Sequence, residues 1–326
     1  MRHPFLRPGI LAMAGLALAT LAAPSFADAW PSRPLRIVVP FAAGGVSDVA
    51  ARMVANDLGK ALGQSVIVEN KAGAQGVVGS LSAKNAPADG YTLVLMSSSV
   101  ACVNPYLRKN MPFSALKDFD AVGMIGTVPL MMLVSPKLGI STVEQFLTHA
   151  KAHPGKANYS TPGIGGSAHL YSESINRKFT LDMQHVPYQG GAPAVQALLA
   201  GEVMMTMADM SFADSQVASG KLVALGVAGE RRWPSLPQVP TFTEAGQPLN
   251  LVGWVGLMAP AGTPQPIVQR INAEMQKIMA VQSNANTLLR LGVLADTKAP
   301  EDMTRALRDG CPPWGDAVRQ AGIQPE

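Results

Sequence analysis

The 326-residue sequence has few of the residues from which metal, redox and nucleic-acid sites are built. It contains two cysteines, five histidines and only 15% charged residues. Neither cysteine belongs to a CxxC pair, and the histidines show no metal-ligand spacing with carboxylates, so we expect no metal and no cofactor. The formal charge of +4 is small for this length, so nucleic acid is not an expected partner.

Long apolar runs are lacking after the first residues. Residues 10–23 are apolar, follow the basic Arg2 and Arg7, and precede small residues around Ala27. This order is typical of a secretory signal peptide at residues 1–27, and the run is too short to span a bilayer comfortably. Cleavage near Ala27 would leave 299 residues with a formal charge of +2. The sequence therefore predicts an exported protein of the periplasm.

The two cysteines, Cys102 and Cys311, lie far apart in the sequence. In an oxidising compartment they can pair and tie the C-terminal segment to the first third of the chain. They can equally be two separately buried thiols, because cysteine is among the most buried residue types. The sequence leaves both alternatives open.

Apolar residues follow strand and helix patterns in alternation. An apolar, β-branched run between two prolines predicts a strand over residues 35–39, and apolar residues recurring every three or four positions predict a helix from 46 to 61. Further strands are expected at 65–68, 91–96, 130–134, 157–160, 184–187, 203–207, 222–227 and 252–258. A turn at 73–79 is expected to lead into a helix that runs to about 86, and further helices are expected at 142–152, 167–179, 192–200, 212–219, 266–280 and 301–307. This alternation predicts α/β structure with mainly parallel sheets covered by helices.

The elements fall into two series, which suggests two lobes. The first lobe is expected to comprise residues 28–126 and 228–326, and the second residues 127–227. The chain would then cross between the lobes near 123–130 and again near 224–230. Two crossings can form a hinge that closes a cleft.

Two glycine-rich turns follow predicted strands. Residues 41–48 read FAAGGVSD, and residues 161–169 read TPGIGGSAH. Ligands of open α/β sheets bind beyond the carboxyl ends of the strands, and the first amides of a helix suit an anion. Glycine lets a ligand approach the backbone closely. The two turns therefore predict two surfaces for an anionic ligand.

Several residues at these turns have both a structural and a functional interpretation. Asp48 either complements the helix dipole or accepts a hydrogen bond from the ligand or from a loop that shapes the pocket. Ser167 either only caps the helix predicted at residues 167–179, or it also contacts a ligand carboxylate that binds the remaining amides of that helix start. The serine run at 97–99 follows a predicted strand, where such a run is often merely a turn.

Enzyme motifs are absent from the sequence. GIGGSA is not GxGxxG, no GK[ST] follows either turn, and GGSAH lacks the final glycine of a nucleophile elbow. His169 lies two residues after Ser167, which on a helix directs the two side chains to different faces. A serine hydrolase using Ser167 is therefore the less favoured alternative to a binding protein. A carboxylate receptor for a membrane sensor is a further alternative.

Eight segments together resemble the Bug family, the exported substrate-binding receptors of tripartite tricarboxylate transporters. They are WPSRPLRIVVPFAAGGVSDVAAR, VENKAGAQGVVGS, APADGYTLVLMSSS, NPYLRKNMPF, LKDFDAVGMIG, YSTPGIGGSAHLYSE, HVPYQGGAPAVQALLAGEV and LPQVPTFTEAG. The resemblance implies a two-lobed type II periplasmic binding protein, or Venus flytrap, that is not an enzyme. It also implies a monomer that holds a small organic carboxylate between its lobes and delivers it to integral membrane transporter subunits.

The resemblance and the turns together give a set of expected ligand-binding residues. They are Phe41, Ala42, Gly44, Gly45, Asp48, Ser97, Ser98, Thr161, Gly163, Gly165, Ser167, His169, Tyr188 and Asp209. The chain departs from the family pattern near the expected cleft. Gln189 replaces a basic residue, and Met204 and Ala208 stand where the family often has acidic residues, with Asp209 one position later. These changes predict a ligand that differs from the commonly described dicarboxylates.

Overall fold

The computed structural model describes residues 30–249 and 251–325, and residues 31–326 form one compact unit. The predicted signal peptide at residues 1–27 lies outside the described residues. Within the described ranges, no helix has the length and apolar character needed to cross a membrane. The same residues contain no group of histidine, cysteine, aspartate or glutamate side chains that could hold a metal ion.

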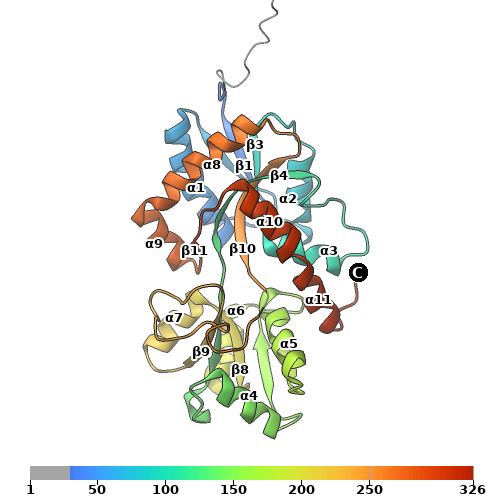
Figure 1. Cartoon of the computed structure of the whole chain (residues 1–326), viewed down its shortest axis with the longest axis vertical. Helices are drawn as coiled ribbons and strands as arrows, with labels where there is room; N and C mark the ends of the chain where they lie inside the picture. Colours follow the sequence, from blue (N-terminus) through green and yellow to red (C-terminus); the bar gives the residue numbers. More distant parts are fainter. Residues whose placement is uncertain (1–29, 250, 326) are drawn as a thin grey trace, which may run out of the picture. The chain divides into compact units, whose positions relative to one another are not determined.

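The first sheet has six strands in the order β11-β4-β10-β3-β1-β2. It lies in the upper part of the view in Figure 1. Its strands are β1 (Leu35–Val39), β2 (Val66–Asn70), β3 (Thr92–Ser97), β4 (Phe119–Thr127), β10 (Trp254–Pro260) and β11 (Leu294–Ala295). Its helices are α1 (Val46–Leu62), α2 (Val77–Lys84), α8 (Gln265–Ala280), α9 (Gln282–Arg290) and α10 (Pro300–Gly310). Both crossovers, β1-α1-β2 and β2-α2-β3, join parallel strands but run in opposite directions along the sheet. Right-handed crossovers therefore put α1 and α2 on opposite faces.

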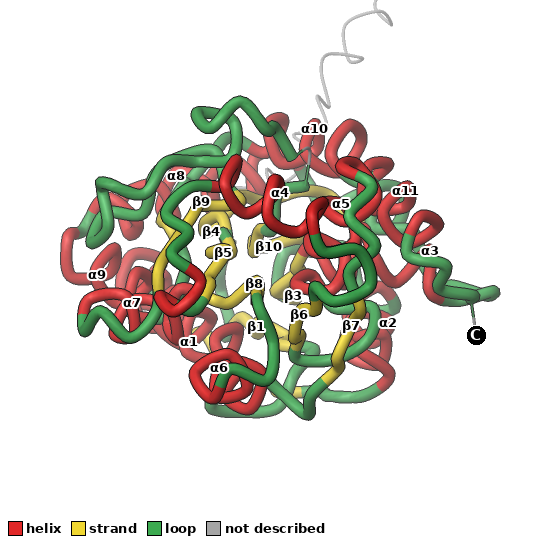
Figure 2. The backbone as a smooth tube through the Cα atoms, turned by 90° about the horizontal axis from the view of Figure 1, so that it is seen from below, coloured by secondary structure: helices red, strands yellow, loops and turns green. Residues whose placement is uncertain are grey.

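The second sheet has five strands in the order β7-β6-β8-β5-β9. Its strands are β5 (Leu130–Val134), β6 (Asn158–Thr161), β7 (Gln184–Pro187), β8 (Met205–Asp209) and β9 (Val223–Ala228). Its helices are α4 (Val143–Ala152), α5 (Ser167–Phe179), α6 (Gly191–Ala200) and α7 (Met210–Ala218). Figure 2 shows α6 on the other side of this sheet from α4 and α5. Because β6 and β8 are parallel neighbours, their carboxyl ends lie at the same edge of the sheet, where α5 and α7 begin.

The two-lobed α/β architecture is confirmed, but the sheets are mixed rather than mainly parallel. Strand β10 runs antiparallel to both β3 and β4, and β5 runs antiparallel to both β8 and β9. Parallel neighbours require a crossover connection of a dozen or more residues. Only two residues join β4 to β5, and they carry the chain directly from one sheet into the other.

The two segments that connect the sheets lie side by side. Val128, between β4 and β5, donates its amide to the carbonyl of Gly253, just before β10, over 2.7 Å. The proline-rich segment after β9 still packs against the second sheet, because Thr241 pairs with Val227 and Trp233 lies in one apolar cluster with Met131. The chain therefore leaves the second sheet later than the crossing predicted at 224–230. The lobe boundaries themselves stay a prediction.

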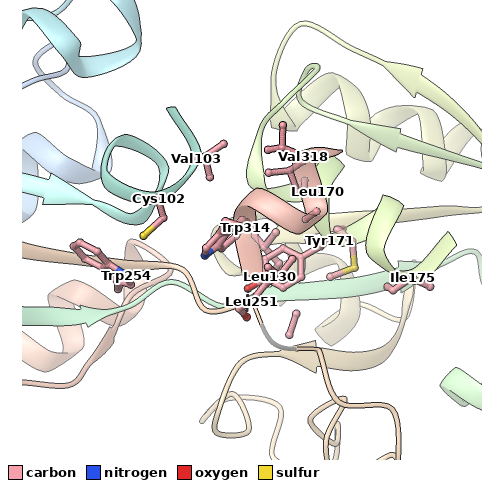
Figure 3. Close-up of a cluster of buried hydrophobic side chains, with 14 of the residues drawn as sticks. Cys102, Val103, Leu130, Leu170, Tyr171, Ile175, Leu251, Trp254, Trp314 and Val318 are labelled. Atoms are coloured by element: carbon pink, nitrogen blue, oxygen red, sulfur yellow. Dashed lines mark hydrogen bonds between the residues drawn. The ribbon is translucent and has the colours of Figure 1, made fainter. Parts of the chain in front are cut away.

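The last helix, α11 (Pro312–Gln320), touches parts of both lobes. Cys311 forms a disulfide with Cys102 of the π-helical segment Ser99–Val103, so the paired alternative for the cysteines is correct. Trp314 is buried against Tyr171 of α5, with ring centroids 5.5 Å apart in an edge-to-face arrangement (Figure 3). The Tyr171 hydroxyl donates to the carbonyl of Leu251 over 2.7 Å. This apolar cluster therefore connects α11 and α5 beside the segment that precedes β10.

Candidate functional site

A cleft of about 410 Å³ lies where the two sheets' connecting loops face each other. The first lobe contributes Phe41, Gln75, Ser99, Val103, Asn104 and Leu107. The second lobe contributes Leu130, the loop and helix start at residues 162–168, and Asp209. No lysine, arginine or histidine is among these lining residues. In the described part of the chain, the cleft walls are therefore formed by backbone, apolar, amide and hydroxyl groups with a single carboxylate.

The two glycine turns have the same backbone conformation. In each, a glycine with positive φ, Gly44 at 86° or Gly165 at 78°, precedes an extended glycine that caps the helix. The caps are Gly45 (φ −79°, ψ 172°) for α1 and Gly166 (φ −73°, ψ 165°) for α5. The positive φ values explain the need for glycine at the first position of each pair.

Each turn is held by the side chain four residues after its first glycine. The amide of Gly44 donates to Oδ2 of Asp48 over 2.9 Å, and the amide of Gly165 donates to Nδ1 of His169 over 3.1 Å. Asp48 and His169 are 3% and 5% exposed, so both lie behind their loops. Of the two interpretations of Asp48, the structure supports the acceptor that shapes a loop. His169 has the equivalent position in the second lobe.

Asp48 is an ionised acceptor. Besides Gly44, its carboxylate accepts hydrogen bonds from Nε of Arg52 at 3.0 Å and from Nδ2 of Asn70 at 2.9 Å. The hydrogen bond from Arg52, together with those from Gly44 and Asn70, lowers the pKa of Asp48 to about 2, although burial opposes this shift. The first turn therefore keeps its acceptor throughout the neutral and mildly acidic range.

His169 is a neutral acceptor in a buried aromatic stack. Its ring stacks on His185 with centroids 4.0 Å apart, and burial lowers the pKa of His169. Because Nδ1 accepts the Gly165 amide, the ring must be unprotonated at that nitrogen. Burial, with the nearby His169, lowers the pKa of His185 to about 4. The second turn therefore depends on histidines that stay neutral at pH 7.

Polar groups beneath the stack orient the histidines. Nε2 of His185 lies 2.6 Å from the hydroxyl of Thr161, which donates to the carbonyl of Gly163 in the second turn. On its other face His185 stacks on Tyr159, whose hydroxyl donates to Glu173. Burial raises the pKa of Tyr159, so its hydroxyl keeps its proton. Thr161 is thus a support of the turn and lies behind the cleft wall.

The start of α5 offers unpaired amides to the cleft. In the described part of the chain, the backbone amides of Ile164, Gly166, Ser167 and Ala168 make no hydrogen bond. The cap of α5 is Gly166, so the interpretation of Ser167 as the cap is wrong; Ser167 is the first helical residue and makes no cap hydrogen bond. Its position inside the helix leaves its hydroxyl beside the cleft. Amides at a helix start carry partial positive charge and attract anions.

Asp209 is the only charged side chain that lines the cleft among the described residues. It stands at the end of β8, directly before α7, and makes no side-chain cap hydrogen bond there. Its carboxylate has no hydrogen bond or ion pair with any other described residue. Burial raises the pKa of Asp209, because the surrounding protein removes water without supplying a partner.

The structure brings together five of the residues expected from the sequence. Phe41, Gly163, Gly165, Ser167 and Asp209 all line the cleft. The others lie elsewhere. Ala42, Gly44 and Gly45 are exposed on the first turn without lining the cleft. Asp48, Thr161 and His169 lie beneath the turns, and Tyr188 is half-buried away from the cleft.

Three of the displaced residues have structural partners of their own. The Tyr188 hydroxyl donates to Glu202 over 2.9 Å. The hydroxyl of Ser98 accepts the Trp254 amide over 3.2 Å, and the Ser97 hydroxyl accepts the Val100 amide over 3.4 Å. In the serine run, Ser99 is the residue that lines the cleft.

The sequence reasoning missed several lining residues of the first lobe. Gln75 has a positive φ of 56° within the turn GAQG, and its carbonyl accepts a hydrogen bond from Nδ2 of Asn104 over 2.9 Å. The two glycines on either side of Ala74 and Gln75 are a turn signal that could have drawn attention to Gln75. Val103, Asn104, Leu107 and Leu130 carry no such signal, because only the tertiary structure brings them to the cleft.

Comparisons with known proteins agree with this architecture. The model of a family described as "Tripartite tricarboxylate transporter family receptor" matches residues 50–323. Protein BugT of Bordetella pertussis is 34% identical over 319 residues, which cover 97% of this chain and 98% of that protein. A UPF0065 protein from the gbd 5' region of Cupriavidus necator is 36% identical over 290 residues, covering 89% of this chain and 88% of that protein.

Solved structures with the same fold include ligand complexes. An R. palustris protein solved with adipate is 30% identical, covers 91% of this chain and 100% of its own, and superposes with a TM-score of 0.74. MatC from Rhodopseudomonas palustris, solved with bound malate, is 29% identical with a TM-score of 0.69, covering 89% and 100%. A TctC solute-binding protein from Polaromonas, without ligand, is 28% identical with a TM-score of 0.81, covering 89% and 99%.

Proposed function

The chain belongs to the tripartite tricarboxylate transporter receptor family, and from this premise we propose that it is an exported receptor that binds a small organic carboxylate in the cleft. The ligand would then be delivered to integral membrane subunits of a transporter. Two of the similar solved structures hold adipate and malate, which supports a carboxylate as the ligand class.

The observation that carries the proposal is the set of unpaired amides at the start of α5. Four backbone amides, from Ile164, Gly166, Ser167 and Ala168, lie at a cleft that no lysine or arginine of the described residues lines. A carboxylate can accept hydrogen bonds from such amides, and charge-assisted bonds of this kind are stronger than neutral ones. The buried support from His169 and Thr161 holds the amides in place before the ligand arrives.

The lobes provide the mechanism for capture. A ligand held at the start of α5 can also contact first-lobe residues such as Gln75, Ser99 and Asn104, whose polar groups line the same cleft. Contacts to both lobes favour a closed arrangement through differential affinity for the two states. Capture and release then require no covalent chemistry. Ser167 has no general base in His169, because Nδ1 of that ring already accepts the Gly165 amide.

A thermal-shift screen of the mature protein tests the proposal. The compounds are mono-, di- and tricarboxylic acids and amino acids, with neutral sugars as controls. A ligand at a hundredfold excess over its Kd adds about 2.7 kcal/mol to the free energy of unfolding, which gives a clear rise in Tm. Stabilisation by a carboxylate and not by the sugars supports the proposal. Stabilisation by uncharged compounds alone would contradict it.

A glycine substitution locates the site. Gly166→Val is compatible with the extended backbone of this cap, and an added Cβ would meet only the Gly163 carbonyl oxygen, at 3.9 Å. The side chain would occupy the space in front of the free amides, so we expect affinity to fall on the order of tenfold or more. Gly310→Val, in α10 where a Cβ meets nothing within 4 Å, is the matched control. Equal affinity of the two variants would place the ligand elsewhere.

A further inference from the structure

Among the described residues, the one charged side chain that lines the cleft is negative, although the expected ligand is an anion. Asp209 lines the cleft, has no partner among the described residues, and is half-buried, and this burial raises its pKa. Enclosing a carboxylate without a partner costs free energy, and proteins normally supply a hydrogen-bond donor or a cation. Within the described chain the donors of the cleft wall are uncharged. A ligand that occupies the cleft can supply the missing partner.

Asp209 lies close to the amides that are available for a ligand carboxylate. Strands β6 and β8 are parallel neighbours, with Ser160 opposite Thr206. Gly163 and Asp209 each follow these paired residues by three positions, so they leave the sheet at adjacent strand ends. Neighbouring strands are about 4.8 Å apart. A small ligand can therefore reach the α5 amides with one end and Asp209 with the other.

We propose that Asp209 makes this receptor selective for small zwitterions of the amino acid type, whose carboxylate meets the α5 amides and whose ammonium group pairs with the Asp209 carboxylate. This inference rests on the proposed function and specifies the ligand class of the same cleft. A dicarboxylate of similar length would place its second negative charge beside Asp209, where like charges repel each other. An ammonium group instead provides the donor that Asp209 lacks and removes the cost of its burial.

The selectivity is tested with pairs of ligands that differ only in the amino group. Isothermal titration calorimetry at pH 7 compares aspartate with succinate, glutamate with glutarate, and 4-aminobutyrate with butyrate. The mature wild-type protein is measured beside Asp209→Asn, which keeps the side-chain shape and removes the charge. Asp316→Asn, on the exposed surface of α11, serves as the matched control.

The inference predicts that, in at least one pair, the wild type binds the amino compound tenfold or more tightly than its partner. Asp209→Asn should abolish that preference by weakening the amino compound, and Asp316→Asn should leave it unchanged. The affinity for the amino compound should also fall as the pH is lowered from 7 to 4, because Asp209 then takes up a proton. A protonated Asp209 that donates to a second ligand carboxylate would give the opposite pH dependence.

The contradicting results separate this inference from the proposed function. Tight binding of acids that lack an amino group, with weaker or no binding of their amino partners, overturns the role of Asp209 and leaves carboxylate capture intact. An equal effect of Asp209→Asn on both members of every pair also overturns it. Failure of all carboxylates and amino acids to bind refutes the proposed function and the inference together.

Discussion

Removal of the disulfide between Cys102 and Cys311 should destabilise the protein strongly while leaving its native contacts in place. The bond closes a loop of 209 residues, the separation of the two cysteines. In the chain-entropy model, a loop of this length stabilises the folded state by about 5 kcal/mol, because the unfolded chain is constrained. The effect thus acts mainly on the unfolded state, and Trp314 should remain packed against Tyr171 in the native protein.

Urea denaturation of three samples measures this effect: the oxidised wild type, the reduced wild type, and the double variant Cys102→Ala with Cys311→Ala. The buried Trp233, Trp254 and Trp314 provide the fluorescence signal. Reduction keeps every side-chain atom, so it separates the crosslink from the small cavity left by the alanines. Both perturbed samples should lose several kcal/mol of unfolding free energy. A loss below about 1 kcal/mol in the reduced wild type would refute the reasoning.

Two further predictions concern the second turn. Burial lowers the pKa of His185 to about 4, so between pH 6.5 and pH 4 the unfolded chain binds a proton that the folded chain does not. The free energy of unfolding should therefore be highest above pH 6.5 and should fall by roughly 2 kcal/mol as the pH is lowered to 4. This value includes a discount for the partial exposure of the ring. His185→Gln should flatten this part of a pH series of urea titrations, and an unchanged slope would contradict the assignment. Ser167→Ala should change the unfolding free energy by less than about 0.5 kcal/mol, because Ser167 makes no cap bond, yet weaken ligand binding in calorimetry. A clear loss of stability would instead restore its role as a cap.

The sequence predicted the elements whose periodicity is strong and uninterrupted. Strand β1 and helix α5 have the predicted limits, and helix α1 extends one residue further than predicted. Strand β4 was missed because Gly123 and Gly126 interrupt its pattern. In the structure these glycines allow close packing, since a Cβ would collide with Asn272 or with the backbone of Leu294.

Helix α11 was missed for a related reason. Its start reads CPPWG, which resembles a turn, but the prolines occupy the first helical turn, where their missing amides cost nothing. Gly315 is required there because the ring of Tyr106 lies against it. Such requirements arise from residues far away in the sequence, and local patterns do not contain them.

The sequence predicted where the candidate site lies, but it did not predict which residues line the cleft. The two glycine turns were found because their composition and position after strands are local features, whereas Asp209 was expected from the family resemblance. Which residues line the cleft and which support the turns from behind depends on the tertiary structure, and local sequence patterns do not show it. Asp48 and His169 hold the turns from behind, and this became visible only through their hydrogen bonds to Gly44 and Gly165.

The most direct test of the central claim is an amide-resolved titration. Uniformly ¹⁵N-labelled mature protein is titrated with the best carboxylate from the screen, and the backbone amide resonances are followed by nuclear magnetic resonance. Carboxylate binding at the start of α5 should shift the amide protons of Ile164, Gly166, Ser167 and Ala168 strongly downfield, because each would gain a charge-assisted hydrogen bond. Saturable binding that leaves these four resonances unchanged would contradict the account.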